Sequence, residues 1–121
     1  ALLRRYSDAG RELIFEISDL GDSQNDMNPK NAWFHLLFLA MEICTNDLKY
    51  GIGESIWRIV RKGNDLLILQ ENQIARLKKD AATGKRIVER TSLMGGVVKS
   101  TIRKNRLAIE IFLPNFWGDS V

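Results

Sequence analysis

The 121-residue chain has very few of the residues that build metal centres and cross-links. It contains one cysteine, Cys44, and one histidine, His35. A single cysteine excludes an internal disulfide and a cysteine-based zinc site, and a single histidine disfavours a histidine-rich metal site or a Ser-His-Asp triad. The scarcity of cysteine fits a reducing compartment. Cys44 lies on the apolar side of its predicted helix, so we expect it to be a core residue.

Long apolar runs and a strong charge of one sign are also missing. No apolar run approaches the roughly 18 to 20 residues that a membrane span needs, and the start has no signal-peptide pattern. The net charge is only +3, and the basic residues are spread along the chain, whereas a dedicated nucleic-acid binder usually has a clustered basic face. We therefore expect no nucleic-acid partner and no membrane contact from this segment.

The remaining composition is that of one ordinary globular domain. Hydrophobic residues make up 45% and charged residues 27% of the chain, which is typical of soluble proteins. A chain of this length can build one core but not two. It begins with Ala1 rather than Met, so we expect residues 1–121 to be a single domain excised from a longer chain.

Apolar periodicity and turn residues predict alternating helices and strands. The expected order is a helix over Leu2–Asp8, a strand over Glu12–Ser18, a helix from Asn28-Pro29 to about Tyr50, strands over Ile56–Arg61 and Leu66–Gln70, a helix over about Lys85–Met94, and strands over Val97–Arg103 and Arg106–Leu113. Asn28 and Pro29 are good residues to begin a helix, and Gly51 would end it in the left-handed conformation. Two predicted hairpins favour a mixed, mostly antiparallel sheet. The expected fold is α+β, a two-layer α/β sandwich with about three helices on one face of about five strands.

The long predicted helix carries a polar stripe among apolar residues. Glu42, Asn46 and Lys49 are spaced i, i+4 and i+7 and so share one side of the helix. The apolar residues cover much of the remaining circumference, which predicts a helix buried against a sheet. Polar groups on such a helix need partners, so the stripe lines a cavity, a ligand or the helix end. The alternative is the solvent-facing edge of an amphipathic helix.

The segment that holds this stripe, Met41–Gly51, resembles the N box of the ATP-binding domain of sensor histidine kinases, in the GHKL (Bergerat-fold) superfamily. That box has Glu, then Asn four residues on, then a basic residue and a His or Tyr near the helix end. Leu2–Ser18 looks like the segment before the N box, Ile87–Gly96 like the helix after the second glycine box, and the hairpin closed by Leu113-Pro114 like the usual end. The resemblance covers nearly the whole chain and points to the subtype with a short ATP lid.

The resemblance implies roles for the polar stripe. Asn46 would hold the magnesium ion that bridges the ATP phosphates, and Glu42 would be the catalytic residue that orients or deprotonates a water or stabilises the metal shell. Lys49 and Tyr50 would approach the phosphates or the base. Amide and carboxylate oxygens suit magnesium, which keeps several waters and relies on substrate phosphates.

Both glycine boxes of the family are degenerate here. In the first, Glu71 takes the place of the Asp that binds the adenine amino group, while Gln73 and Ala75 replace the two glycines. Glycine allows the backbone to approach the nucleotide closely, and these side chains occupy that space. In the second, Asp80–Arg86, only Gly84 survives.

Lys85 or Arg86 could supply charge to a phosphate at the start of the following helix. The alternative for this stretch is a solvated loop with a basic helix start. The three tryptophans, Trp33, Trp57 and Trp117, are expected in the core or at its edge.

These observations lead to one main hypothesis and two alternatives. The main hypothesis is the catalytic, ATP-binding domain of a two-component sensor histidine kinase-like protein, with Mg-ATP binding weakened by the lost glycines. The first alternative is a non-catalytic, pseudokinase-type interaction module, and a weaker one is an anti-sigma-factor-like serine kinase.

Whether the domain is an enzyme stays open, because the phosphoacceptor histidine would lie on a separate dimerisation helix and His35 does not match it. The expected partners are that helix of the parent chain and a response regulator, and the expected location is cytoplasmic, also for a membrane-anchored parent.

Overall fold

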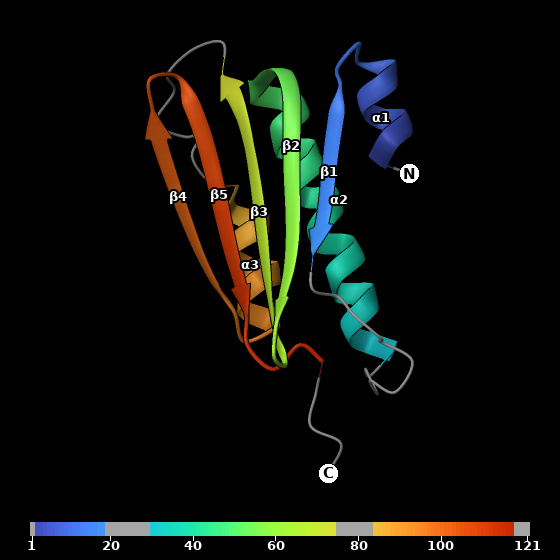
Figure 1. Cartoon of the computed structure of the whole chain (residues 1–121), viewed down its shortest axis with the longest axis vertical. Coiled ribbons are helices and arrows are strands. Elements are labelled where there is room, and N and C mark those ends of the chain that lie inside the picture. The colour runs from blue at the N-terminus through green and yellow to red at the C-terminus, as the bar shows by residue number, and fades with distance from the viewer. Residues whose placement is uncertain (1, 19–29, 75–83, 118–121) are drawn as a thin grey trace.

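The structure is a computed structural model that describes residues 2–18, 30–74 and 84–117. Within these residues it contains three helices and five strands (Figure 1). In chain order they are α1 (Leu2–Asp8), β1 (Leu13–Ser18), α2 (Lys30–Tyr50), β2 (Gly51–Lys62), β3 (Asp65–Ile74), α3 (Lys85–Leu93), β4 (Val97–Arg103) and β5 (Arg106–Leu113). None of the helices in the described part is long and apolar enough to cross a membrane.

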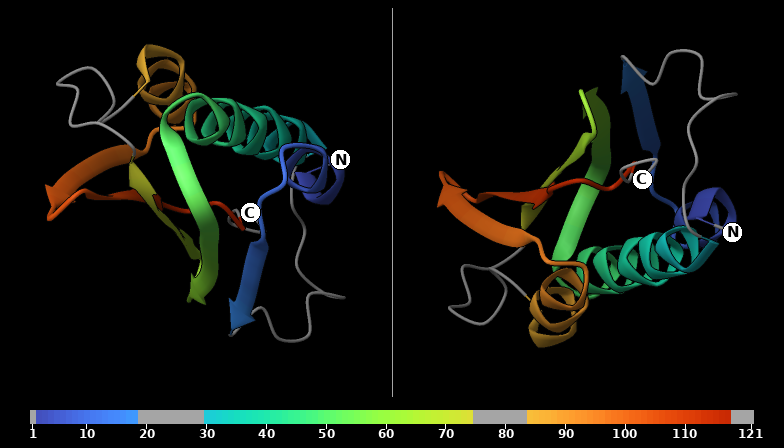
Figure 2. Two further views of the ribbon diagram at one scale, coloured as in Figure 1. Left: turned by 90° about the horizontal axis from the view of Figure 1, so that it is seen from above. Right: turned by 90° about the horizontal axis from the view of Figure 1, so that it is seen from below.

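The five strands form one mixed sheet in the order β1-β2-β3-β5-β4. β1 runs parallel to β2, and the other neighbours are antiparallel. The three helices lie on one face of this twisted sheet, and no helix of residues 2–18, 30–74 and 84–117 covers the other face (Figures 1 and 2). This arrangement confirms the predicted α+β two-layer sandwich.

The core lies between the helices and the sheet. Strand alternation directs every second residue of β3 and β5 toward the helices, and α2 and α3 contribute one apolar stripe each. Cys44 and Trp57 are buried, and Trp117 is nearly so, as expected. Trp33 is half exposed at the edge, where its ring packs edge-on against Phe116 and Trp117.

The predicted burial of α2 against the sheet holds for one side of the helix, and some of the apolar residues on which the prediction rested lie outside that side. Trp33 is 48% and Leu37 is 56% exposed, whereas Leu39 and Ile43 are fully buried. The reason is geometric, because only one stripe of a helix can face a sheet.

The passage from α2 into β2 also differs from the prediction. Gly51 is not left-handed; the left-handed glycines among the described residues are Gly10, Gly53, Gly63 and Gly95. Instead, a Cβ atom on Gly51 would overlap the Asp47 carboxylate. Glycine is therefore required here for close approach rather than for its φ angle. The predicted cap at residues 28–29 lies outside the described residues.

A buried polar network fixes the end of α2. The Tyr6 hydroxyl donates to Asp47 Oδ2 at 2.6 Å, and Gln70 Nε2 donates to the same oxygen at 3.2 Å. Arg11 Nη2 lies 2.8 Å from Asp47 Oδ1, and the Ser55 hydroxyl donates to the Tyr6 hydroxyl at 3.2 Å. The network joins α1, α2, β2 and β3 at the residue next to Asn46. It therefore sets the position of Asn46.

Removing one donor from this network should destabilise the domain. Tyr6→Phe leaves the ring in place but takes a hydrogen bond from a buried carboxylate, so we expect the free energy of unfolding to fall by about 1–3 kcal/mol. Urea denaturation measures this. The control is Asp8→Asn on the same helix, where an exposed ion pair with Arg4 at 3.9 Å should contribute less than about 0.5 kcal/mol. Equal losses in both variants would contradict the role of the network.

The same hydroxyl predicts a loss of stability at alkaline pH. Burial, and then the Asp47 carboxylate, raise the pKa of Tyr6 well above its ordinary value of 10.0. Above pH 10 the unfolded chain therefore loses this proton while the folded chain keeps it, so stability falls with rising pH, by up to about 1.4 kcal/mol per unit. Burial also raises the pKa of the Cys44 thiol, and a hydrogen bond from Tyr6 partly offsets that rise.

The measurement is the free energy of unfolding from pH 8 to 11 for the wild type and Tyr6→Phe. The difference between them should shrink above about pH 10. A difference that stays constant with pH would contradict the assignment.

Candidate functional site

Asn46 is the most unusual polar residue on α2. Its side chain is 8% exposed, and its Nδ2 atom is buried without a hydrogen-bond partner among the described residues. Gly84, just before α3, lies against it: a Cβ atom added to Gly84 would be 3.2 Å from Asn46 Oδ1. Because buried amide groups are almost always paired, the unpaired Nδ2 group is available to donate a hydrogen bond to a ligand atom at the start of α3.

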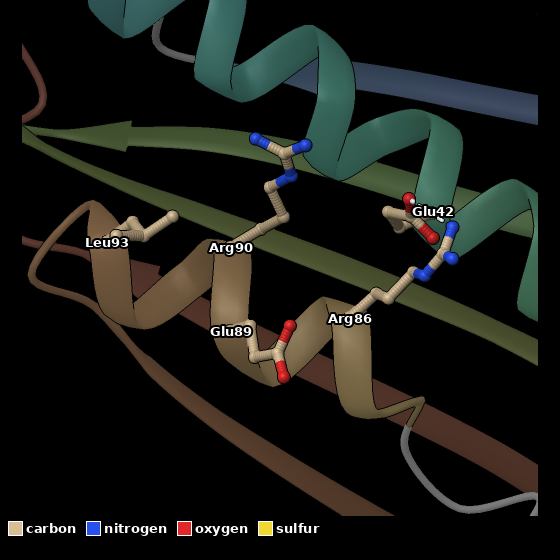
Figure 3. Close-up of a pocket in the computed structure, with 5 residues that line it drawn as sticks. All are labelled: Glu42, Arg86, Glu89, Arg90 and Leu93. Atoms are coloured by element: carbon tan, nitrogen blue, oxygen red, sulfur yellow. Dashed lines mark ion pairs between the residues drawn. The ribbon is translucent and has the colours of Figure 1, made fainter.

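Glu42, one turn before Asn46, faces α3. Arg86 Nη1 lies 3.8 Å from Glu42 Oε1, and the Arg86 side chain is 79% exposed. The two residues border a cavity of about 290 Å³ between α2 and α3, and Figure 3 shows them facing each other across it. Its other lining residues are Glu89, Arg90 and Leu93.

The start of α3 adds donors to the same region. Gly84 is extended, and no side chain caps the helix. The first amides of a helix have no partner within it and carry partial positive charge, which favours anions. Lys85 is exposed beside Arg86. Asn46, Glu42, Gly84, Lys85 and Arg86 thus gather where a phosphate and a divalent cation could sit together.

The donor set fits magnesium better than zinc. No group of three or more His, Cys, Asp or Glu side chains that could hold a metal occurs in the described ranges. One amide oxygen from Asn46 and one carboxylate from Glu42 match a cation that keeps several waters and takes its other ligands from phosphates.

Lys49 and Tyr50 lie on the last turn of α2 and interact with each other. The Lys49 ammonium is 5.1 Å from the centre of the Tyr50 ring. Neither residue lines the cavity between α2 and α3. Their proposed approach to a nucleotide stays a prediction.

Glu71 is not brought to this site. β3 continues to Ile74, so Glu71 lies within a strand and on the sheet face opposite the helices, with Arg58 and Arg106 at 3.6 and 3.4 Å. Successive residues of a strand point to opposite faces of the sheet. Glu71 therefore does not occupy the base-binding position near Asn46 that the sequence predicted. Its neighbour Asn72 faces the helices instead and is fully buried.

Sequence reasoning missed the buried amides and carboxylate near Asn46. Gln70 Nε2 donates to Asn72 Oδ1 at 2.8 Å, and Asn72 Nδ2 donates to the Gln73 carbonyl at 2.8 Å. Leu66, Ile68, Gln70, Asn72 and Ile74 alternate with other residues, and this pattern could have extended the strand past Gln70. Asp47 lies among apolar positions of the predicted helix, and this pattern could likewise have indicated a buried carboxylate. Residues 75 and 80–83 of the two glycine boxes lie outside the described residues.

Comparisons with known proteins support the fold. No protein-family model matches the chain, and no curated protein matches its sequence. Among solved structures, 94% of the chain aligns with 59% of the histidine kinase domain of the blue-light-activated kinase EL346 from Erythrobacter litoralis, with a TM-score of 0.66 and 15% identity.

Two further structures give the same result. Full-length ShkA in complex with AMPPNP aligns over 93% of this chain and 27% of its own, with a TM-score of 0.66 and 14% identity. The nucleotide-free catalytic domain of the histidine kinase ThkA aligns over 94% of this chain and 85% of its own, with a TM-score of 0.67 and 9% identity. The chain spans less than two thirds of the EL346 and ShkA chains. It has the fold of the catalytic domains of these histidine kinases.

Proposed function

We propose that this chain is the nucleotide-binding domain of a histidine kinase-like signalling protein and that it binds Mg-ATP weakly between the end of α2 and the start of α3. The observation that carries the proposal is the buried Asn46 side chain, whose Nδ2 atom has no hydrogen-bond partner in the described part of the chain and whose Oδ1 atom would lie 3.2 Å from a Cβ atom added to Gly84. The fold adds support, since the kinase ShkA with the same fold was solved with AMPPNP.

Each group in this region has a role in the proposal. Asn46 would hold the magnesium ion through its amide oxygen, and Glu42 would hold a water of the metal shell. The ion supplies charge neutralisation for the phosphate oxygens. Arg86 and the first amides of α3 would stabilise the same phosphates, because guanidinium groups and helix N-termini both favour anions.

Weak binding follows from the lost glycine boxes. Glu71 and Gln73 extend β3 as an ordinary strand where the family has a glycine turn. The backbone then cannot approach the nucleotide as closely, and each lost charge-assisted hydrogen bond costs about 1.5–3 kcal/mol. Two or three such losses turn a micromolar site into a millimolar one.

The wider context completes the proposal. In this proposal the chain is a single domain of a longer protein. Its partners are the dimerisation helix of that protein and a response regulator. Its location is cytoplasmic. His35, on α2, is not the phosphoacceptor. The isolated domain therefore does not autophosphorylate.

One observation favours the pseudokinase alternative. The Gln70 and Asn72 amides are paired with each other and fully or almost fully buried, and Glu71 points away from Asn46. Little remains on β3 to recognise a base. In this alternative the fold is retained for contacts with other signalling domains.

Replacing Asn46 should distinguish the two proposals. We expect the wild type to bind Mg-ATP with a Kd of roughly 1 mM and Asn46→Ala to bind at least about tenfold more weakly, because the metal loses its protein ligand. NMR titration with Mg-ATP and Mg-ADP measures this. Thr45→Ala, next to Asn46 but bonded to Arg5 of α1, is the control and should bind like the wild type. No binding by the wild type at roughly 10 mM would favour the pseudokinase.

Replacing Glu42 should change the dependence on magnesium. Glu42→Gln removes a negative charge near the phosphates, so we expect ATP without magnesium to bind a few-fold more tightly and Mg-ATP a few-fold more weakly. The same titrations with and without magnesium measure both effects. The control is Glu89→Gln, which changes the net charge equally from the α3 side of the cavity. Identical behaviour of the two variants would rule out a metal-shell role for Glu42.

A further inference from the structure

A second hollow lies on the outer face of the sheet, away from the helices. It has a volume of about 410 Å³. We call it the outer-face pocket, and it is lined by Glu71, Gln73, Thr101, Arg103, Lys104, Arg106 and Ala108. Because the sheet separates it from Asn46 and α3, it does not belong to the proposed nucleotide site.

Strand pairing explains why this part of the sheet is hollow. Gln73 of β3, Arg106 of β5 and Arg103 of β4 lie in one cross-strand row. In the next row Ala108 stands between Glu71 and Thr101. A methyl group surrounded by long side chains leaves a depression with Ala108 at its floor.

The charges around the pocket are unbalanced. Arg103 and Arg106 are directly opposite each other, and like charges in that position destabilise a strand pair. The only carboxylate that lines the pocket, Glu71, is 3.4 Å from Arg106 and is shared with Arg58 at 3.6 Å. Three cations against one carboxylate give the lining a formal charge of +2.

Lys104 adds to this imbalance at a backbone position that does not favour lysine. It has φ +51° and Asn105 has φ +62°, which are the left-handed angles of a two-residue hairpin turn. Asn and Gly adopt these angles at little cost, whereas a lysine there is strained. Neither Arg103 nor Lys104 forms an ion pair with any residue in the described ranges.

We propose that the outer-face pocket binds a phosphate dianion, either as the free ion or as the phosphate group of a small organic molecule. Guanidinium groups bind phosphate through two parallel hydrogen bonds, and an anion would relieve the repulsion between Arg103 and Arg106. The Thr101 hydroxyl and the Gln73 amide add neutral donors. The volume is that of a small-molecule site, and the Ala108 methyl with the aliphatic stems of the cations offers an apolar surface.

NMR titrations at constant ionic strength test the proposal, with inorganic phosphate and phenyl phosphate as probes. Both should shift the backbone amides of Gln73, Thr101 and Ala108. Equal affinities would identify the free ion as the ligand, and tighter binding of phenyl phosphate would identify an organic phosphate. Shifts spread evenly over the basic residues of the chain would overturn the proposal.

Three variants make the test specific. Arg103→Gln should weaken phosphate binding at least about tenfold, and Ala108→Leu should abolish it by filling the floor. Lys104→Asn should weaken binding while keeping or raising thermal stability, because asparagine suits the turn. Lys99→Gln, on the same strand and opposite Glu110 but outside the pocket, is the control.

Two further results would contradict the proposal. One is an equal loss of phosphate binding in Lys99→Gln and Arg103→Gln, and the other is unchanged binding in Ala108→Leu. Asn46→Ala should leave phosphate shifts at the outer-face pocket unchanged, so the failure of either site is visible independently of the other.

Discussion

The ion pair and hydrogen bonds of Asp47 fix the end of α2, next to the proposed nucleotide site. A buried carboxylate is costly unless its oxygens are paired, and here Tyr6 of α1, Arg11 of the connection between α1 and β1, and Gln70 of β3 pair them. The network ties α1 and the sheet to the last turns of α2. Asn46, the next residue back along the helix, is thereby held beside Gly84.

The two faces of the sheet carry different chemistry because strand side chains alternate. Along β3, the inward residues Gln70 and Asn72 join the buried network, while Glu71 and Gln73 face outward into the outer-face pocket. Neighbouring residues of β3 therefore face different sites. One residue points to the helix side, where the candidate magnesium and nucleotide site lies, and the next points to the cationic outer-face pocket.

Much of the fold follows from sequence patterns. The two hairpins, β2–β3 and β4–β5, and the helix over Lys85–Leu93 are local, and their Gly, Asn and apolar spacings predict them closely. The extension of β3 to Ile74 was missed because Gln70 and Asn72 are polar, and only tertiary partners make polar residues acceptable inside.

The candidate site was only partly predictable for the same reason. Helix spacing placed Glu42 and Asn46 on one stripe, but their meeting with Gly84 and Arg86 depends on how α3 packs. That Glu71 faces away from the helices could not be predicted, because its side-chain direction depends on strand register, which the resemblance to the family did not supply.

The proposed binding of Mg-ATP depends on the proximity of Asn46 to Gly84 at the start of α3. The most direct measurement is the response of the Asn46 side-chain amide and the Gly84 backbone amide to saturating Mg-ATP in NMR spectra of the domain. We expect these two signals to shift together, with the same apparent Kd. If both stay in place while signals elsewhere move, Mg-ATP does not bind between α2 and α3 and the proposed function is wrong.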